Sequence, residues 1–346
     1  MENQAILLIK AFKFLGNSNS NDSNKEKKII KRSFKQHSNF NNGFIQRLEN
    51  EYFIYNNMNS LSLYYYDDKS DKISQLSESK SEIKESIYSI SVSDIEYKIL
   101  VCLLNQKIVK IYDYNLKNKI LKLNPKEINE TPNQSSHFNK CIQIEENYFV
   151  TGDDIYIKIW AGTSDSLNLI LIKNYKINLN TFDLLYTEEY FISSQPKKKT
   201  LILFENNNLS YLKTITNIEC QEKTNCLFRL NENYIIIACE KGLGLFCIKT
   251  KELIQFLEFN YSKYNRITCD DEENIYILNR EENYNSSYYS QYYYFKIINF
   301  KFIENEIIFV NESENINTSE YNLEITSLYD DIILLWKNGL YSSKEE

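Results

Sequence analysis

The chain has 346 residues and a formal net charge of −7, an acidic balance that argues against nonspecific nucleic-acid binding by the protein as a whole. Its seven cysteines include no Cys-x-x-Cys pair, and most lie inside apolar runs, which is typical of small buried side chains in a reducing compartment. The apolar run 5–9 is too short to span a membrane, so we expect a cytoplasmic protein, with the nucleus as an alternative.

The composition favours β-structure. The chain has 28 Tyr and 19 Phe, and aromatic residues, like the plentiful isoleucines, suit pleated and half-buried surfaces. A protein with many turns needs residues that accept a positive φ, yet there are only 7 Gly and 3 Pro. Asparagine is therefore expected to occupy many of these turn positions.

A repeated unit runs along the chain: an apolar run, an acidic or asparagine-containing turn, then usually a tyrosine and a second apolar run. The marker tyrosines are Tyr52, Tyr97, Tyr148, Tyr190 and Tyr234, spaced 45, 51, 42 and 44 residues apart, and two further copies follow at Asn274 and Asp331. Third and fourth apolar runs come after the second one in each of the first six units. This pattern predicts repeats of four short antiparallel strands.

The third unit has the most specific pattern, in the segment 137–160. His137 lies four residues before Cys141, Thr151 lies in the second apolar run, and Asp154 lies six residues before Trp160. On these residues the segment resembles one repeat of the WD-repeat β-propeller family. The resemblance implies that His137, Thr151, Asp154 and Trp160 form a hydrogen-bonded structural tetrad that fixes one blade.

Two positions depart from the family pattern. Ser136 replaces the usual glycine before the histidine, and Ala161 replaces the usual aspartate after the tryptophan. The family repeat of roughly 40–45 residues nevertheless agrees with the marker spacing.

The resemblance implies an all-β fold, a seven-bladed β-propeller of four-stranded antiparallel blades that forms a single domain over residues 1–346. The last unit offers only three runs, 323–328, 331–337 and 339–344, while the run 5–14 has no unit of its own. We therefore expect the N-terminal run to pair with the C-terminal blade as its fourth strand and close the ring. Trp336 stays ambiguous, because it lies six residues after Asp330, as in the tetrad, but falls in a second strand.

Strand alternation also predicts the two faces of the ring. The turns between second and third strands, and the connections between blades, emerge on one face together with most long segments, including the flexible Asn/Ser/Lys-rich loop 16–43. The opposite face carries the short turns between first and second strands, and six of the repeats have a glutamate close to the same place: Glu51, Glu96, Glu146, Glu189, Glu232 and Glu273. Long loops on a rigid scaffold are where binding sites usually lie.

Catalytic, cofactor-binding and metal-binding residues are not expected. The only histidines are His37 and His137, there are no clustered zinc ligands, and no G-x-S-x-G motif occurs. Gly242 and Gly244 lack the third glycine of a phosphate loop. Asp153 and Asp154 are interpreted as turn residues.

The prediction is a non-catalytic interaction scaffold or adaptor that presents loops to other proteins, as part of a complex and without a cofactor. The candidate partner-binding residues come from basic loops and a tyrosine-rich run: Lys28, Arg32, Lys197, Lys198, Lys199, Tyr288 and Tyr289. Two alternatives remain open. One is a nuclear adaptor that binds nucleic acid or chromatin through the basic loops 25–35 and 197–199, and the other, less favoured, is a propeller enzyme.

Overall fold

The structure is a computed structural model. It describes residues 5–10, 45–49, 51–57, 60–67, 69, 72–79, 87–93, 95–104, 106–130, 137–162, 168–177, 183–195, 200–215, 224–239, 242–258, 266–269, 273–281, 293–312, 316–318, 324–328 and 331–336. Within these ranges, no helix is long and apolar enough to cross a membrane.

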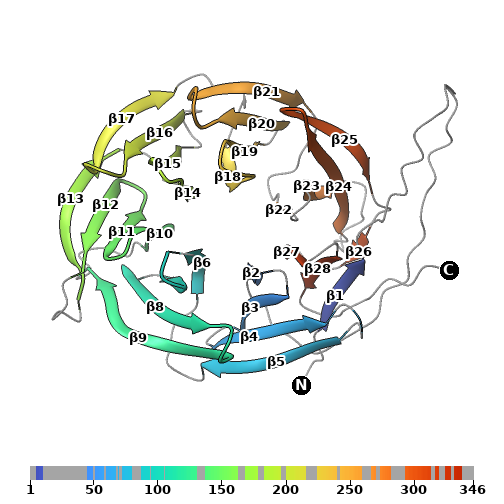
Figure 1. Cartoon of the computed structure of the whole chain (residues 1–346), viewed down its shortest axis with the longest axis horizontal. Helices are drawn as coiled ribbons and strands as arrows, with labels where there is room; N and C mark the ends of the chain where they lie inside the picture. The colour runs from blue at the N-terminus through green and yellow to red at the C-terminus, as the bar shows by residue number, and fades with distance from the viewer. Residues whose placement is uncertain are drawn as a thin grey trace, which may run out of the picture.

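Six antiparallel sheets with four strands in sequence order form the blades of a ring (Figure 1). Blade 1 contains β2 (Ile45–Glu49), β3 (Tyr52–Asn57), β4 (Ser60–Asp67) and β5 (Lys72–Ser79); blade 2 contains β6 (Ile87–Ser93), β7 (Lys98–Leu103), β8 (Ile108–Asn115) and β9 (Ile120–Asn129); and blade 3 contains β10 (Lys140–Glu145), β11 (Tyr148–Gly152), β12 (Tyr156–Ala161) and β13 (Ile170–Lys176). Blade 4 contains β14 (Asp183–Tyr186), β15 (Tyr190–Gln195), β16 (Thr200–Glu205) and β17 (Ser210–Ile215); blade 5 contains β18 (Thr224–Arg229), β19 (Tyr234–Cys239), β20 (Gly242–Cys247) and β21 (Glu252–Glu258); and blade 6 contains β22 (Arg266–Cys269), β23 (Asn274–Glu281), β24 (Tyr293–Ile303) and β25 (Glu306–Glu312), with β26 (Ile316–Thr318) added beside β24.

The remaining described strands form a three-stranded sheet in the order β1–β28–β27, from β1 (Ala5–Lys10), β28 (Asp331–Trp336) and β27 (Glu324–Leu328). β27 contacts β22 of blade 6 and β2 of blade 1, so this sheet lies between the two blades. The expectation of seven four-stranded blades is therefore wrong: the described residues form six four-stranded blades, and the described strands of the last unit belong to this three-stranded sheet.

The last sheet has three described strands because of where the N-terminal strand pairs. β1 pairs antiparallel with β28 directly, with Ala5 opposite Trp336 and Lys10 opposite Asp331. It therefore takes the third position of the sheet and not the expected fourth. The run 339–344, which the sequence suggested as the third strand, lies outside the described residues.

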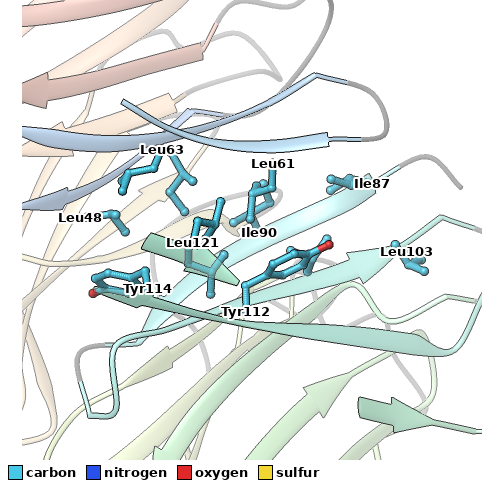
Figure 2. Close-up of a cluster of buried hydrophobic side chains, with 12 residues drawn as sticks. Leu48, Leu61, Leu63, Ile87, Ile90, Leu103, Tyr112, Tyr114 and Leu121 are labelled. Carbon is cyan, nitrogen blue, oxygen red and sulfur yellow. The ribbon is translucent and has the colours of Figure 1, made fainter. Parts of the chain in front are cut away.

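Apolar side chains from neighbouring blades form the core. Each third strand lies inside its own blade, between the second and fourth strands, and β20 is buried at all six positions. Outer strands are more exposed, as in β13. One cluster joins Leu61 and Leu63 of β4 to Tyr112 and Tyr114 of β8 and thus packs blade 1 against blade 2 (Figure 2).

Asparagine was expected at the turn positions with a positive φ, but other residues occupy most of them. Among the described non-glycine residues with a positive φ, only Asn305 is an asparagine. The others are Tyr97, Lys119, Leu209, Lys251, Glu273 and Glu304. Asparagines instead accept hydrogen bonds in turns through their side chains. Asn115 Oδ1 accepts the Asn118 N–H at 2.9 Å, and Asn231 Oδ1 accepts the N–H groups of Asn233 and Tyr234 at 2.9 and 3.0 Å. Asparagine thus stabilises these turns mainly through its side chain.

Candidate functional site between blades 2 and 3

Four charged side chains meet where blades 2 and 3 join. Lys107 lies in the turn between β7 and β8, and Asp153 lies in the equivalent turn between β11 and β12. Glu130 directly follows β9, and Lys158 is in β12. Each blade therefore contributes one cation and one carboxylate, and we call these four residues the charge cluster.

The charge cluster links the two blades through alternating charges. Lys158 Nζ donates to Glu130 Oε1 at 2.7 Å and lies 3.5 Å from Asp153 Oδ2. Lys107 Nζ donates to Asp153 Oδ2 at 3.0 Å and lies 3.7 Å from Glu130 Oε2. Because the side chains of Lys158 and Asp153 are each only 3% exposed, losing one partner would leave a buried charge uncompensated.

Asp153 is also the residue that shapes its turn. Its Oδ1 accepts the N–H groups of Ile155 at 2.8 Å and Tyr156 at 2.7 Å. Burial raises the pKa of Asp153, but these two hydrogen bonds and Lys107 outweigh it and hold the pKa below its usual value. Burial likewise opposes the charge on Lys107, yet the carboxylates of Asp153 and Glu130 raise its pKa. The Lys107–Asp153 pair is therefore ionised, and it holds the two blades together instead of exchanging protons at neutral pH.

A second group of side chains, which we call the rim, lies beside the charge cluster and consists of Tyr88, His137, Asn139, Asp154 and Ile155. The rings of Tyr88 at the start of β6 and His137 before β10 lie 3.9 Å apart, centroid to centroid. The exposed Asp154 accepts a hydrogen bond from Asn139 Nδ2 at 3.1 Å. Its charge raises the pKa of Tyr88, after the larger effect of burial, so the carboxylate lies near both blades.

The structure brings only some of the expected tetrad together. Trp160 Nε1 donates to Thr151 Oγ1 at 2.8 Å, and both residues are buried. The buried Nδ1 of His137 has no hydrogen-bond partner among the described residues, and the hydrogen bond of Asp154 goes to Asn139. Burial lowers the pKa of His137, although the charge of Asp154 opposes this. The complete four-residue network stays a prediction.

Side chains in or next to the turns on the opposite face also link neighbouring blades. Gln143 of blade 3 donates to Glu96 of blade 2, and Asn231 of blade 5 donates to Glu273 of blade 6 at 2.8 Å. Arg229 of blade 5 lies 4.0 Å from Glu188 of blade 4. Some of the repeated acidic turns therefore take part in the contacts between blades.

The residues proposed from sequence as partner contacts lie outside the described residues. They are Lys28, Arg32, Lys197, Lys198, Lys199, Tyr288 and Tyr289. The flexible loop predicted over residues 16–43 lies outside them as well.

Sequence reasoning missed Tyr88, Lys107, Glu130 and Lys158. One signal was available, because Lys158 interrupts the otherwise apolar run of a third strand, and a lysine there must find a carboxylate when it is buried. Tyr88, Lys107 and Glu130 lie 70, 51 and 28 residues before Lys158, and only the packing of the blades brings them to the same junction.

The thiols beneath the rim are not activated. Burial raises the pKa of Cys102 to about 11, and it raises the pKa of Cys141 well above its usual value. Both remain protonated at neutral pH, and a protonated thiol is a poor nucleophile. Among the residues that the structure describes, no group of three or more His, Cys, Asp or Glu residues could hold a metal ion.

Comparison with known proteins supports the fold and not an activity. No protein-family model and no curated protein matches the chain. Among solved structures, 1059 chains are similar, and a similarity shared by so many chains does not identify one function. One of them, from the crystal structure of a mitotic checkpoint complex, has a TM-score of 0.55 and 10% sequence identity over 94% of this chain and 97% of that chain. At this identity the likeness shows the architecture alone, and the architecture is that of a β-propeller.

Proposed function

We propose that the protein is a non-catalytic interaction scaffold of the WD-repeat type, which binds other proteins as a subunit of a complex. The observation that carries the proposal is the charge cluster between blades 2 and 3. Its charges are paired across the blade junction, with Lys107 Nζ 3.0 Å from Asp153 and Lys158 Nζ 2.7 Å from Glu130. Such pairing fixes the relative positions of the blades, and it leaves the neighbouring exposed turns as a firmly supported surface.

Two further observations support the proposal. The buried hydrogen bond from Trp160 to Thr151 joins two of the residues on which the WD-repeat resemblance rests. The similar solved chain from a mitotic checkpoint complex belongs to an assembly of proteins. Both fit a propeller that works through contacts with other proteins.

The test is the state of the full-length chain in a native extract. We expect a tagged copy to elute well above the 41.2 kDa of the single chain and to co-purify with a small set of proteins in fixed stoichiometry. Size-exclusion chromatography and quantitative mass spectrometry measure both properties. Elution as a single chain, without any stoichiometric partner, would overturn the proposal.

A further inference from the structure

We propose that the rim between blades 2 and 3 is a docking site for an arginine side chain in an extended segment of a partner protein. This inference rests on the proposed scaffold function and assigns it a place and a chemistry. It is carried by the position of a carboxylate beside an exposed aromatic ring, on the face where the turns between second and third strands emerge.

The shape of the rim fits a planar cation with an aliphatic stem. Tyr88 is 37% exposed, and its ring lies against that of His137 at a centroid distance of 3.9 Å. A guanidinium group stacks favourably on such a ring. Ile155, which is 42% exposed and directly follows Asp154, offers an apolar surface for the stem.

Among the residues that the structure describes, no cation pairs with the charge of the rim. Asp154 is exposed, and within the described residues its hydrogen-bond donor is the neutral amide of Asn139, 3.1 Å away. The pKa of His137 is lowered, so the imidazole beside Asp154 is neutral at neutral pH and supplies no positive charge. A guanidinium would provide the missing charge and could donate two hydrogen bonds to the carboxylate.

The nearby lysines are committed to other partners. Lys107 and Lys158 belong to the charge cluster, where Asp153 and Glu130 bind them. Lys140 lies 3.3 Å from the carbonyl oxygen of Ile90 and 3.7 Å from Asp183. The described surroundings therefore hold Asp154 in place without neutralising it, and this is what a cation-binding group requires.

The experiment selects peptides from a displayed library of random twelve-residue sequences on the labelled full-length chain. Affinities of the selected peptides are then measured by fluorescence anisotropy on the wild type and on Asp154→Asn, Tyr88→Ala and Glu306→Gln. The last change is a matched control, because it also removes one exposed carboxylate, but in blade 6 and on the opposite face. Thermal unfolding verifies that each variant is folded.

We expect the selected peptides to share an arginine, and each rim variant to weaken their binding at least about tenfold while Glu306→Gln leaves it unchanged. Replacing the shared arginine with lysine is expected to weaken binding, because lysine lacks the planar fork. Selected peptides without a shared basic residue, no selected peptides at all, or equal affinity for wild type and Asp154→Asn would overturn the inference.

Failure of this inference can be distinguished from failure of the scaffold function. If Asp154→Asn recovers the same stoichiometric partners from extract as the wild type, binding occurs elsewhere on the propeller and only the rim site is rejected. If the wild type itself recovers none, the scaffold proposal fails.

Discussion

Asp153 and Asp154 are neighbours in the chain, yet their environments are opposite. Asp153 is 2% exposed and binds Lys107 and two backbone N–H groups, whereas Asp154 is exposed and binds one amide. We expect Asp153→Ala to lower the free energy of unfolding by about 3–5 kcal/mol, because it leaves Lys107 and Lys158 with Glu130 alone and takes away the acceptor of two backbone N–H groups. Asp154→Ala is expected to change it by less than about 0.5 kcal/mol. Chemical denaturation of both variants measures the difference, and equal losses would show that Asp154 is structural.

His137 is expected to make stability depend on pH. Burial lowers its pKa in the folded chain, so the unfolded chain binds this proton at a higher pH than the folded chain. Stability is therefore fully present above the unfolded pKa of about 6.5 and falls as pH drops below it. The lowered pKa of Asp153 acts only in a more acidic range. Melting temperatures measured between pH 5 and 7.5 test the prediction. His137→Gln should make the melting temperature less dependent on pH, whereas His37→Gln should leave the dependence unchanged. A flatter dependence in His37→Gln would show that His137 is not its source.

Lys119 offers a test of strain in a turn. It adopts φ 56°, a conformation that an L-residue reaches only at a cost and that glycine adopts freely. Lys119→Gly is expected to raise the free energy of unfolding by about 0.5–1 kcal/mol. Lys117→Gly is the control in the same turn, since Lys117 has no positive φ and should lose stability through added freedom of the unfolded chain. Denaturant midpoints of the two variants should move in opposite directions.

At the scale of strands, the sequence was sufficient to locate most elements. Tyr52, Tyr148, Tyr190 and Tyr234 each begin the second strand of a blade, because every copy places an acidic or Asn-containing turn before an apolar run. The turn conformations were less predictable. A positive φ at Tyr97 or Leu209 follows from the register that the two flanking strands adopt, and neither residue signals it.

Outer strands of neighbouring blades are joined by a side chain that imitates backbone pairing. Gln255 in β21 accepts the Ile307 N–H at 2.7 Å and donates to the Ile307 carbonyl at 3.2 Å, so it forms a bridge from blade 5 to blade 6. Gln255→Ala is expected to lower the free energy of unfolding by about 1–3 kcal/mol, because both backbone groups lose their partner. Gln75→Ala in β5 is the control, since Gln75 bonds within its own blade to Ser62 at 3.4 Å. Equal effects of the two changes in chemical denaturation would contradict a special role for the bridge.

At the scale of the whole molecule, the repeat count did not determine the architecture. Seven copies of the unit are visible in the sequence, but a blade also needs a fourth strand, and the last copy forms a sheet with three. The sequence placed the N-terminal run with the last unit, but it could not show that β1 would pair with β28 as the third strand, because an apolar run of this length can add at any free strand edge. The rim and the charge cluster could not be predicted either, since they depend on the positions of two blades relative to one another.

Removal of β1 tests this closure. Deleting residues 1–10 leaves β28 with an unpaired edge, and unpaired edges promote aggregation. We expect the truncated chain to scatter light and to lose a cooperative melting transition. Deletion of residues 1–4, which precede β1, is the control and should leave both properties unchanged. A soluble and equally stable chain without residues 1–10 would show that β1 is dispensable for the ring.

The pairing of β1 with β28 also determines how the ring would respond to mechanical force. Ala5 lies opposite Trp336, so the chain leaves the strand pair toward both termini at the same end. Tension applied between the termini would therefore load the hydrogen bonds of this pair one after another, as in a zipper, and not all at once as in shear. The β1–β28 pair is thus expected to open under a low pulling force and in small steps, before the six blades unfold.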